Sequence, residues 1–323
     1  MGHDSHGVRR LVQYARSIDA GQIHPSERPG VRRRFGATAV VDGNWGLGQP
    51  AARLATDTAV ELAAATGVGA VTLATCNHVG RLGEYVERMA DAGCVGLALC
   101  NSGPIVTPTG GRRRRFGTNP LALAVPRSGG RPLVHDFATA GVAEGKVQEA
   151  LDRGETLAPG LVIDAAGRRT VRPADLYDGG ALLPFGGHKG SGLSLMIEMI
   201  GGLLTGMGAA SMPDYAGGNG TLLLALSIEA FTGFDGFADA AAAFAATVTT
   251  AEDGGSEAGI LLPGQLERKT AAERDASGVH VPLVTRRHIT AVAASVGVDL
   301  GRFSVPDEAP IVQPGGSMTA GSV

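Results

Sequence analysis

Short apolar runs alternate along this chain with segments whose apolar residues recur at helical spacing, and this alternation constrains the fold more than any other feature. Runs typical of strands cover residues 37–41, 69–74, 95–100, 121–125, 133–136 and 221–228. Helical spacing covers residues 8–18, 51–65, 82–92, 142–153, 189–204, 237–248, 271–276 and 286–296. Alternating strands and helices pack as layers around one core. The sequence therefore predicts an α/β fold, a layered sheet covered by helices.

Two regions interrupt this pattern. Residues 157–178 are polar and contain several Pro and Gly residues, which predicts a long surface loop or a domain junction. After Pro306 the tail carries Pro, Gly and Ser, which predicts a mobile end. A chain of 323 residues is expected to form about two domains, at roughly 100–200 residues each.

The bulk composition excludes several classes of protein. A formal net charge of −3 lacks the basic excess of a nucleic-acid binder, and we interpret the one basic cluster, Arg112 to Arg115, as a solvated loop. The most apolar stretch, residues 193–204, is too short to span a bilayer. No apolar run opens the chain as a signal peptide would. We therefore expect neither nucleic acid nor membrane as a partner.

Cysteine usage indicates the compartment. Cys76, Cys94 and Cys100 lie in apolar surroundings, their number is odd, and no Cys-x-x-Cys spacing exists. These features predict buried free thiols in a reducing compartment rather than disulfides or a structural zinc site. We expect a cytoplasmic protein without a bound metal.

The segment Gly46-Leu47-Gly48-Gln49-Pro50-Ala51 matches the dinucleotide-binding pattern Gly-x-Gly-x-x-Gly/Ala between a predicted strand and a predicted helix. In a Rossmann fold the N–H groups of such a turn bind pyrophosphate. Pro50 has no N–H, and the next strand ends in Asn77-His78 instead of an acid for the ribose. Because Pro50 also suits the first turn of a helix, we favour an ordinary helix start.

The N-terminal segment Asp4-Ser5-His6-Gly7-Val8-Arg9-Arg10 concentrates reactive side chains. The Ser5 hydroxyl beside the His6 imidazole forms a unit for proton transfer near neutral pH. Arg10 follows His6 by four residues, which places both on one face of a helix, and arginine binds carboxylates through two parallel hydrogen bonds. These residues could hold an acid substrate. A frayed N-terminus with Ser5 as a helix cap explains them equally well.

The segment Thr75-Cys76-Asn77-His78-Val79-Gly80-Arg81 lies between a predicted strand and a predicted helix. Open α/β sheets place their chemistry at the carboxyl ends of strands, which makes His78 a candidate acid or base. The alternative is that Asn77 caps the helix and His78 is structural.

Three other segments suit either a ligand or an ordinary connection. Residues Phe116-Gly117-Thr118-Asn119-Pro120 form a turn that could hydrogen-bond a polar ligand. Asp136 ends a strand and could accept hydrogen bonds from a ribose or an amide, and Lys146 could supply a cation. In Pro184 to Gly192, four glycines surround Lys189 at a helix start, which favours an anionic ligand.

Taken together and in this order, the motifs resemble the malate/L-lactate dehydrogenase family of the non-Rossmann type. Its relatives include sulfolactate and ureidoglycolate dehydrogenases and cyclic imino-acid reductases. The resemblance covers nearly the whole chain to about Gly264. It is carried by Asp4-Ser5-His6-Gly7, Asn77-His78-x-Gly80, Gly117-Thr118-Asn119-Pro120, Asp136-x-Ala138-Thr139, Gly145-Lys146, Gly187-His188-Lys189-Gly190 and Leu262-Pro263-Gly264.

The resemblance implies a non-Rossmann nicotinamide-binding domain, NAD or NADP as cofactor, and a homodimer. It implies a helical part for substrate binding and dimerisation in residues 1–70 and 265–323, and a cofactor-binding domain in residues 71–264. The residues implied to line the cofactor are His78, Val79, Gly80, Arg81, Leu82, Ser102, Asp136, Phe137, Ala138, Lys189, Leu261, Leu262, Pro263, Gly264 and Gln265. Those implied to face the substrate are Ser5, His6, Arg10, His78, Thr118, Glu144 and Gly145.

By this likeness the expected activity is hydride transfer between NAD(P) and a small 2-hydroxy or 2-oxo acid. Arg10 would bind the carboxylate, Ser5 and Thr118 would orient the oxygen, and His78 or His6 would move the hydroxyl proton. We favour His78, because regular structure is expected on both sides of it, whereas His6 is almost at a chain end.

Two features depart from the family pattern. A helical segment normally precedes the Asp-Ser-His-Gly motif, so we expect that the chain is truncated or that its start is assigned too late. Glu144 would repel a substrate carboxylate unless it is paired or protonated, which could favour a substrate with a basic nitrogen. The alternatives are a reductase of cyclic C=N bonds and a catalytically dead binding protein.

Overall fold

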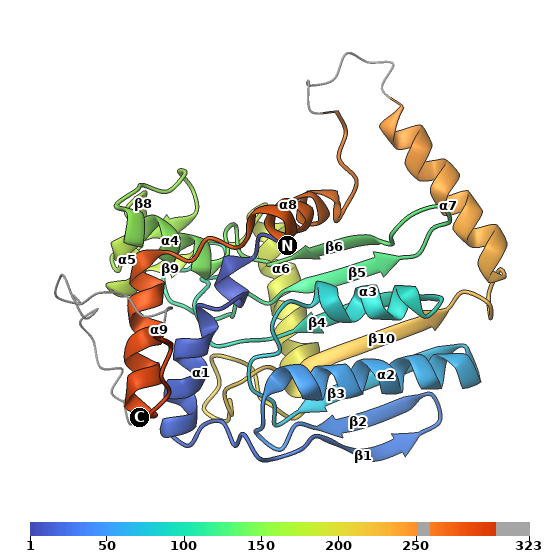
Figure 1. Cartoon of the computed structure of the whole chain (residues 1–323), viewed down its shortest axis with the longest axis horizontal. Helices are drawn as coiled ribbons and strands as arrows, with labels where there is room; N and C mark the ends of the chain where they lie inside the picture. The colour runs from blue at the N-terminus through green and yellow to red at the C-terminus, as the bar shows by residue number, and fades with distance from the viewer. Residues whose placement is uncertain (251–258, 302–323) are drawn as a thin grey trace.

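The computed structural model describes residues 1–250 and 259–301, with seven strands in one twisted sheet (Figure 1). The strand order is β1-β2-β3-β10-β4-β5-β6. The bounds are β1 Gly30–Phe35, β2 Thr38–Asp42, β3 Val68–Ala74, β4 Cys94–Cys100, β5 Leu121–Val125, β6 Leu133–Phe137 and β10 Thr221–Ser227. Strand β2 pairs with β3 in parallel, whereas β10 runs antiparallel to both β3 and β4. The sheet thus has mixed direction and confirms the predicted non-Rossmann α/β class.

Helices cover both faces of this sheet. Helices α2 (Gly48–Thr66) and α3 (Gly83–Asp91) pack on one face, and α6 (His188–Ile197) crosses behind it (Figure 1). A π-helical turn, η2 (Glu198–Leu203), continues α6 against β4 and β10. The alanine-rich α2 lies very close to β3, since a Cβ on Gly69 would stand 1.9 Å from the Ala59 carbonyl oxygen. Small side chains on both elements permit this close packing.

A smaller layer holds the segment that the sequence predicted as a loop or junction. It contains β7 (Val162–Ile163), β8 (Arg169–Thr170), β9 (Ala181–Leu182), α4 (Glu144–Arg153) and α5 (Pro173–Tyr177). Val162, Leu176 and Leu182 are fully buried in its core. The prediction of a surface loop at 157–178 is therefore wrong, because the elements are too short for a periodic pattern to emerge among their polar turns.

The two ends of the described chain lie side by side. The 3-10 turn η1 (Asp4–His6) leads into α1 (Arg10–Asp19), which packs against α9 (Leu283–Ser295). Helix α8 (Gln265–Ser277) lies beside the N-terminus, and α7 (Phe234–Thr249) projects away from the body (Figure 1). No helix within residues 1–250 and 259–301 is long and apolar enough to cross a membrane.

Most predicted elements are present, with ends shifted by a few residues. Strand β1 was missed because its residues are exposed and rich in arginine, without apolar alternation. Arg114 is also not solvated as predicted, since its Nε donates to the Gly180 carbonyl oxygen (2.7 Å). The three cysteines are buried and free, as predicted.

The division into residues 1–70 with 265–323 and residues 71–264 stays a prediction, and the sheet continues across residue 70 because β2 pairs with β3. Residues 302–323, with the tail predicted to be mobile, lie outside the described residues.

Candidate active site

The N-terminal motif and the loop after β3 meet in space, although they are far apart in the sequence. Turn η1 carries His6, and the loop that follows β3 carries His78. The two imidazole rings are stacked, with centroids 5.3 Å apart and an angle of 25° between their planes. The structure therefore brings together the two residues predicted to move a proton.

His78 is held by a chain of hydrogen bonds that the sequence reasoning missed. The Gln49 amide donates to the Tyr14 hydroxyl oxygen (2.6 Å), and this oxygen lies 2.7 Å from His78 Nδ1. The tautomer of His78 decides the direction of the bond to Tyr14, and a proton on Nδ1 that is donated to the Tyr14 oxygen leaves the Nε2 lone pair free to accept a proton. Tyr14 follows Arg10 by four residues, and that spacing was the available signal for it.

The backbone on both sides of His78 is also fixed. The Asn77 amide donates to the Trp45 and Gly46 carbonyl oxygens (2.8 and 3.0 Å). The Val79 N–H donates to Asn219 Oδ1 (3.1 Å). Asn77 thus bridges two loops instead of capping a helix, and His78 projects from a braced segment.

Ser5 and His6 are positioned from the opposite side. Ser5 Oγ lies 3.0 Å from His6 Nδ1, and Arg10 Nε donates to the Ser5 carbonyl oxygen (2.7 Å). The turn is anchored by the pair of Arg274 Nη2 with Asp4 Oδ2 (2.9 Å). Gly145 makes room for it, since a Cβ there would lie 2.1 Å from Ser5 Cβ. Ser5 is consequently buried and fixed rather than frayed.

The electrostatics keep both imidazoles neutral. Burial, assisted by the Arg10 guanidinium, lowers the pKa of His78 to about 3. The same two causes, in that order, lower the pKa of His6 to about 4, although part of His6 remains open to solvent. Protonation of either imidazole to the cation is therefore opposed by desolvation and by the neighbouring positive charge. Burial raises the pKa of the Tyr14 hydroxyl, which keeps it protonated.

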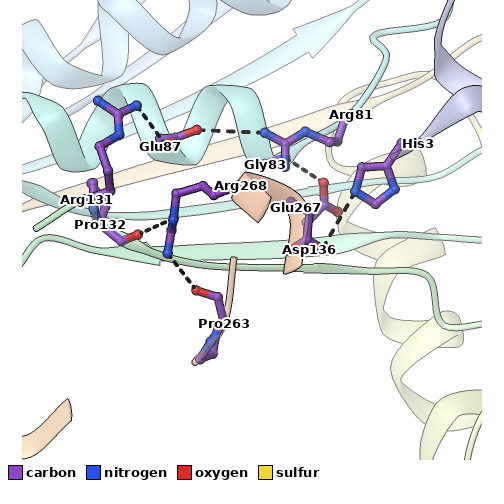
Figure 2. Close-up of polar contacts among 10 residues, drawn as sticks. All are labelled: His3, Arg81, Gly83, Glu87, Arg131, Pro132, Asp136, Pro263, Glu267 and Arg268. Atoms are coloured by element: carbon purple, nitrogen blue, oxygen red, sulfur yellow. Dashed lines mark hydrogen bonds and ion pairs between the residues drawn. The ribbon is translucent and has the colours of Figure 1, made fainter. Parts of the chain in front are cut away.

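A second polar group lies around Asp136 at the end of β6 (Figure 2). The Gly83 N–H, at the start of α3, donates to Asp136 Oδ2 (2.7 Å). Burial raises the pKa of Asp136, while this N–H and the nearby Arg81 act in the opposite direction. His3 Nε2 lies 3.7 Å from Glu267 Oε1 and has no hydrogen-bond partner among the described residues.

The predicted cofactor segment of residues 261–265 lies along the edge of β6. The Val134 N–H donates to the Pro263 carbonyl oxygen (3.3 Å), and Gln265 Oε1 accepts from the Leu262 N–H (2.7 Å). Phe137 contacts Phe185 edge to face, with ring centroids 5.8 Å apart, which brings the start of α6 to the same edge. Gly190 packs there on the Thr139 carbonyl oxygen, and Lys189 is exposed beside it. Three predicted cofactor segments thus share one edge of the sheet.

Two residues predicted to line the cofactor have buried side chains, and their contact with a cofactor stays a prediction. Val79 and Leu82 are each 1% exposed and belong to the main core. Ala138 is half-buried and packs against the core of the smaller layer. Gly80 lies between the two buried side chains and has a φ of 82°, a conformation that favours glycine.

The turn at Thr118 depends on a buried carboxylate that the sequence reasoning did not single out. Glu198 is 2% exposed and accepts from the Gly117 N–H (3.0 Å) and the Asn119 amide (2.8 Å) through Oε1. Its Oε2 accepts from the Ala210 N–H (2.9 Å). The Thr118 N–H donates to Ser102 Oγ (3.2 Å). A single acid within an apolar helical run was the signal for Glu198.

Glu144 does not stand unpaired. The Tyr177 hydroxyl donates to Glu144 Oε1 (2.8 Å), and Glu144 occupies the first turn of α4, where the helix dipole stabilises an anion. Lys146 is engaged by Glu149 (3.1 Å) on the exposed side of the same helix. The repulsion expected between Glu144 and a substrate carboxylate is thereby reduced. Lys146 is not part of the group formed by His6 and His78.

The backbone of the loop that carries His78 packs against the glycine-rich turn at the start of α2. A Cβ on Gly48 would lie 2.3 Å from the His78 carbonyl oxygen, so this glycine serves the approach of the loop that carries His78. Backbone from another loop therefore packs directly against the start of α2, which agrees with the predicted helix start.

The donor set fits a nicotinamide dinucleotide. Ribose hydroxyls and a carboxamide need a carboxylate, a hydroxyl and N–H donors. Asp136 and His3, whose Nε2 makes no hydrogen bond among the described residues, supply a carboxylate and an imidazole, and the Ser102 hydroxyl follows the inner strand β4. Within residues 1–250 and 259–301 no group of three His, Cys, Asp or Glu side chains is arranged to hold a metal ion.

Comparison with known families agrees with this geometry. The model of the malate/L-lactate dehydrogenase family matches residues 1–290. The chain belongs to the malate/L-lactate dehydrogenase family. The resemblance inferred from the motifs is thus confirmed.

Within the malate/L-lactate dehydrogenase family, the chain is similar to enzymes with different substrates. It is 40% identical to a Δ1-pyrroline-2-carboxylate/Δ1-piperideine-2-carboxylate reductase of Pseudomonas syringae pv. tomato over 64% of this chain and 60% of that protein. It is 40% identical to a malate dehydrogenase of Pyrococcus abyssi over 64% of this chain and 58% of that protein. The matches therefore span less than two thirds of these two relatives.

A solved structure of the same family covers more of the chain. The sulfolactate dehydrogenase from Methanocaldococcus jannaschii superimposes with a TM-score of 0.81 at 31% identity, over 92% of this chain and 87% of that one. The non-Rossmann sheet is therefore the architecture of the family.

Proposed function

We propose that this protein is an NAD(P)-dependent oxidoreductase that transfers a hydride between the nicotinamide and a small 2-hydroxy or 2-oxo acid. The observation that supports it most is the stacked, neutral pair of His6 and His78, with Arg10 and Ser5 beside it. A neutral imidazole offers the lone pair that a proton acceptor needs, and a guanidinium recognises a carboxylate.

Each side chain has a task in this proposal. Arg10 uses Nε and Nη1 within the protein, for Ser5 and Gln13, and Nη2 faces the substrate carboxylate. His78 or His6 receives the hydroxyl proton in oxidation and returns it in reduction. Ser5 and Thr118 hydrogen-bond the substrate oxygen, and Gly145 lets Ser5 approach it. The bound nicotinamide supplies or accepts the hydride.

The cofactor is proposed to lie along the edge of the sheet formed by β6 and residues 261–265. Asp136, Ser102, Arg81, Phe137 and the start of α6 at Lys189 surround this edge. In the 78–82 segment, contact falls to His78, Gly80 and Arg81, since the other two side chains are buried.

A reductase of cyclic imino acids is the second candidate. The similarity to the Pseudomonas reductase favours it, because Δ1-pyrroline-2-carboxylate carries its C=N bond at the same 2-position. The Tyr177 hydroxyl already occupies Glu144, so this carboxylate does not by itself select a basic nitrogen.

The experiment is an absorbance assay at the nicotinamide band with NADH or NADPH and two substrate panels. One panel holds 2-oxo acids such as pyruvate, oxaloacetate and sulfopyruvate, and the other holds the two cyclic imino acids. Turnover of the first panel supports the proposal, and turnover of the second alone supports the imino-acid alternative. A protein that binds cofactor but turns over neither panel would be the dead binding protein.

A homodimer is proposed as the assembly. Helix α6 and η2 leave a row of large apolar side chains exposed on one side, namely Leu195, Met196, Met199, Leu203 and Leu204, which are 43–64% exposed. Contiguous apolar surface of this kind is typical of subunit interfaces. A Met199→Glu variant is expected to run as a monomer in light scattering, whereas a persisting dimer would place the interface elsewhere.

A cytoplasmic location is proposed from the cysteines. All three are buried and unpaired, as in proteins from reducing compartments.

A further inference from the structure

Three arginine side chains, Arg127, Arg131 and Arg268, contact the turn between β5 and β6, at the opposite end of β6 from Asp136. Figure 2 shows Arg131 and Arg268. Arg127 Nε donates to the Arg131 carbonyl oxygen (3.1 Å). Arg268, in the first turn of α8, donates to the Pro132 carbonyl oxygen (3.0 Å). These bonds fix the positions of the side chains at backbone oxygens, which do not neutralise their charge.

Carboxylates compensate this cluster only in part. Arg131 Nη2 lies 3.0 Å from Glu87 Oε1, and Glu87 also pairs with Arg81 at 3.8 Å. Among the described residues no carboxylate lies within ion-pair distance of Arg127 or Arg268. Burial lowers the pKa of Arg268, and the charges of Arg127 and Arg131 lower it further, against an opposing effect of Glu87 and Glu267. The cluster therefore carries surplus positive charge that an anion would relieve.

Its location connects it to the proposed cofactor edge. A Cβ on Gly264 would lie 2.9 Å from Arg268 Nη1, so Arg268 adjoins the 261–265 segment directly. Arg131, in the turn before β6, and Asp136, in β6, are five residues apart, which corresponds to at most about 16 Å of extended chain. A dinucleotide with its nicotinamide near the histidines and Asp136 would extend its adenosine toward the arginines.

We propose that Arg127, Arg131 and Arg268 bind the 2′-phosphate of the adenosine ribose, so that the protein prefers NADP(H) to NAD(H). This inference rests on the proposed function. A phosphomonoester carries up to two negative charges and matches the planar fork of a guanidinium. In Rossmann enzymes specific for NAD an acid binds the ribose hydroxyls instead. Here Glu87, which pairs with Arg131, is already engaged by two arginines.

Binding titrations test the proposal without catalysis. NADPH and NADH are titrated by nicotinamide fluorescence, and adenosine 2′-monophosphate and adenosine 5′-monophosphate are tested as competitors. Arg131→Gln is the first variant, because this side chain is 62% exposed and its loss leaves the core intact. The matched control is Arg153→Gln on α4, a side chain that is 61% exposed and distant from β6. Arg268→Gln is the second variant, with its melting temperature measured alongside.

Wild type is expected to bind NADPH more tightly than NADH. Adenosine 2′-monophosphate should displace the bound cofactor at a lower concentration than adenosine 5′-monophosphate. Arg131→Gln should raise the Kd for NADPH about tenfold and change the Kd for NADH by less than about twofold. Equal weakening of both cofactors would assign the arginines to the pyrophosphate and overturn the proposal. Tighter binding of NADH by wild type would also overturn it. If neither cofactor binds, the proposed function itself fails.

Discussion

Replacing Gly145 with alanine should disable the site through one misplaced methyl group. The added Cβ would lie 2.1 Å from Ser5 Cβ, whereas two carbon atoms pack best at about 3.5–4.0 Å. Turn η1 or α4 must therefore move by roughly 1.5 Å. The turn cannot slide freely, because Asp4 is paired with Arg274 and Arg9 with Asp152 (2.8 Å).

The free energy of unfolding should change modestly compared with activity. Overpacking costs about 1–3 kcal/mol, and alanine recovers roughly 0.5–1 kcal/mol because glycine is unfavourable inside a helix. We expect a net loss of about 0–2.5 kcal/mol. A displacement near 1 Å at reacting groups costs on the order of 10² in rate, so kcat should fall about 100-fold.

The assay combines urea denaturation with initial rates for the best substrate. Gly236→Ala in α7 is the control, since no atom lies within 4 Å of its added Cβ, and it should leave kcat unchanged. Adding Ser5→Gly to Gly145→Ala removes the clashing Cβ and should restore stability but not activity. Parental stability and kcat in Gly145→Ala alone would refute the reasoning.

Four further outcomes are expected. Arg10→Lys should raise the KM for acid substrates about tenfold and leave NAD(P)H affinity unchanged, because lysine cannot bind the Ser5 and Gln13 oxygens and still present a donor to the carboxylate; an unchanged KM in steady-state kinetics would contradict this. His78→Asn should lower kcat about 10²–10⁴-fold and His6→Asn should lower it less. The reverse order would assign the proton transfer to His6. Both folded-state pKa values, about 3 for His78 and about 4 for His6, lie below the unfolded value of 6.5, so the unfolded chain binds more protons below that pH. Stability should thus be complete above pH 6.5 and fall toward pH 4, by at most about 1.4 kcal/mol per pH unit for His78 and by less for the exposed, solvent-screened His6, and urea melts of His78→Asn should show a flatter profile. Glu198→Ala should destabilise by about 3 kcal/mol, since it strands several buried N–H donors, and an unaltered melting temperature would show that water replaces the carboxylate.

These pKa values also correct an expectation from the sequence. Histidine ordinarily titrates near neutrality, which suggested a unit for proton transfer near neutral pH. Burial and Arg10 move the free-protein titrations of His6 and His78 well into the acid range. A residue type predicts its ordinary pKa, whereas burial and neighbouring charge are set only when distant segments pack together.

Local sequence patterns were sufficient to predict most helices and strands and most segments that carry reactive side chains. Strand β5 was predicted at its observed bounds, because alternation and β-branched or small residues are properties of a few neighbouring positions. The segments carrying Ser5, His78 and Asp136 were found because polar side chains next to apolar runs are visible without any partner. Strand β1 and the smaller layer escaped, since exposed arginines and two-residue strands leave no period to detect.

The segments that carry chemistry, their resemblance to a family and a sheet layered with helices could all be predicted from the residues along the chain. The insertion of β10 between β3 and β4, the stacking of His6 on His78, and the contacts of Tyr14, Gln49 and Glu198 that hold the site together appear only in the folded molecule. One cause accounts for all of them. Strand pairing, ring stacking and buried hydrogen bonds join residues that are distant along the chain, so their energies depend on the fold as a whole and leave no periodic trace in the sequence.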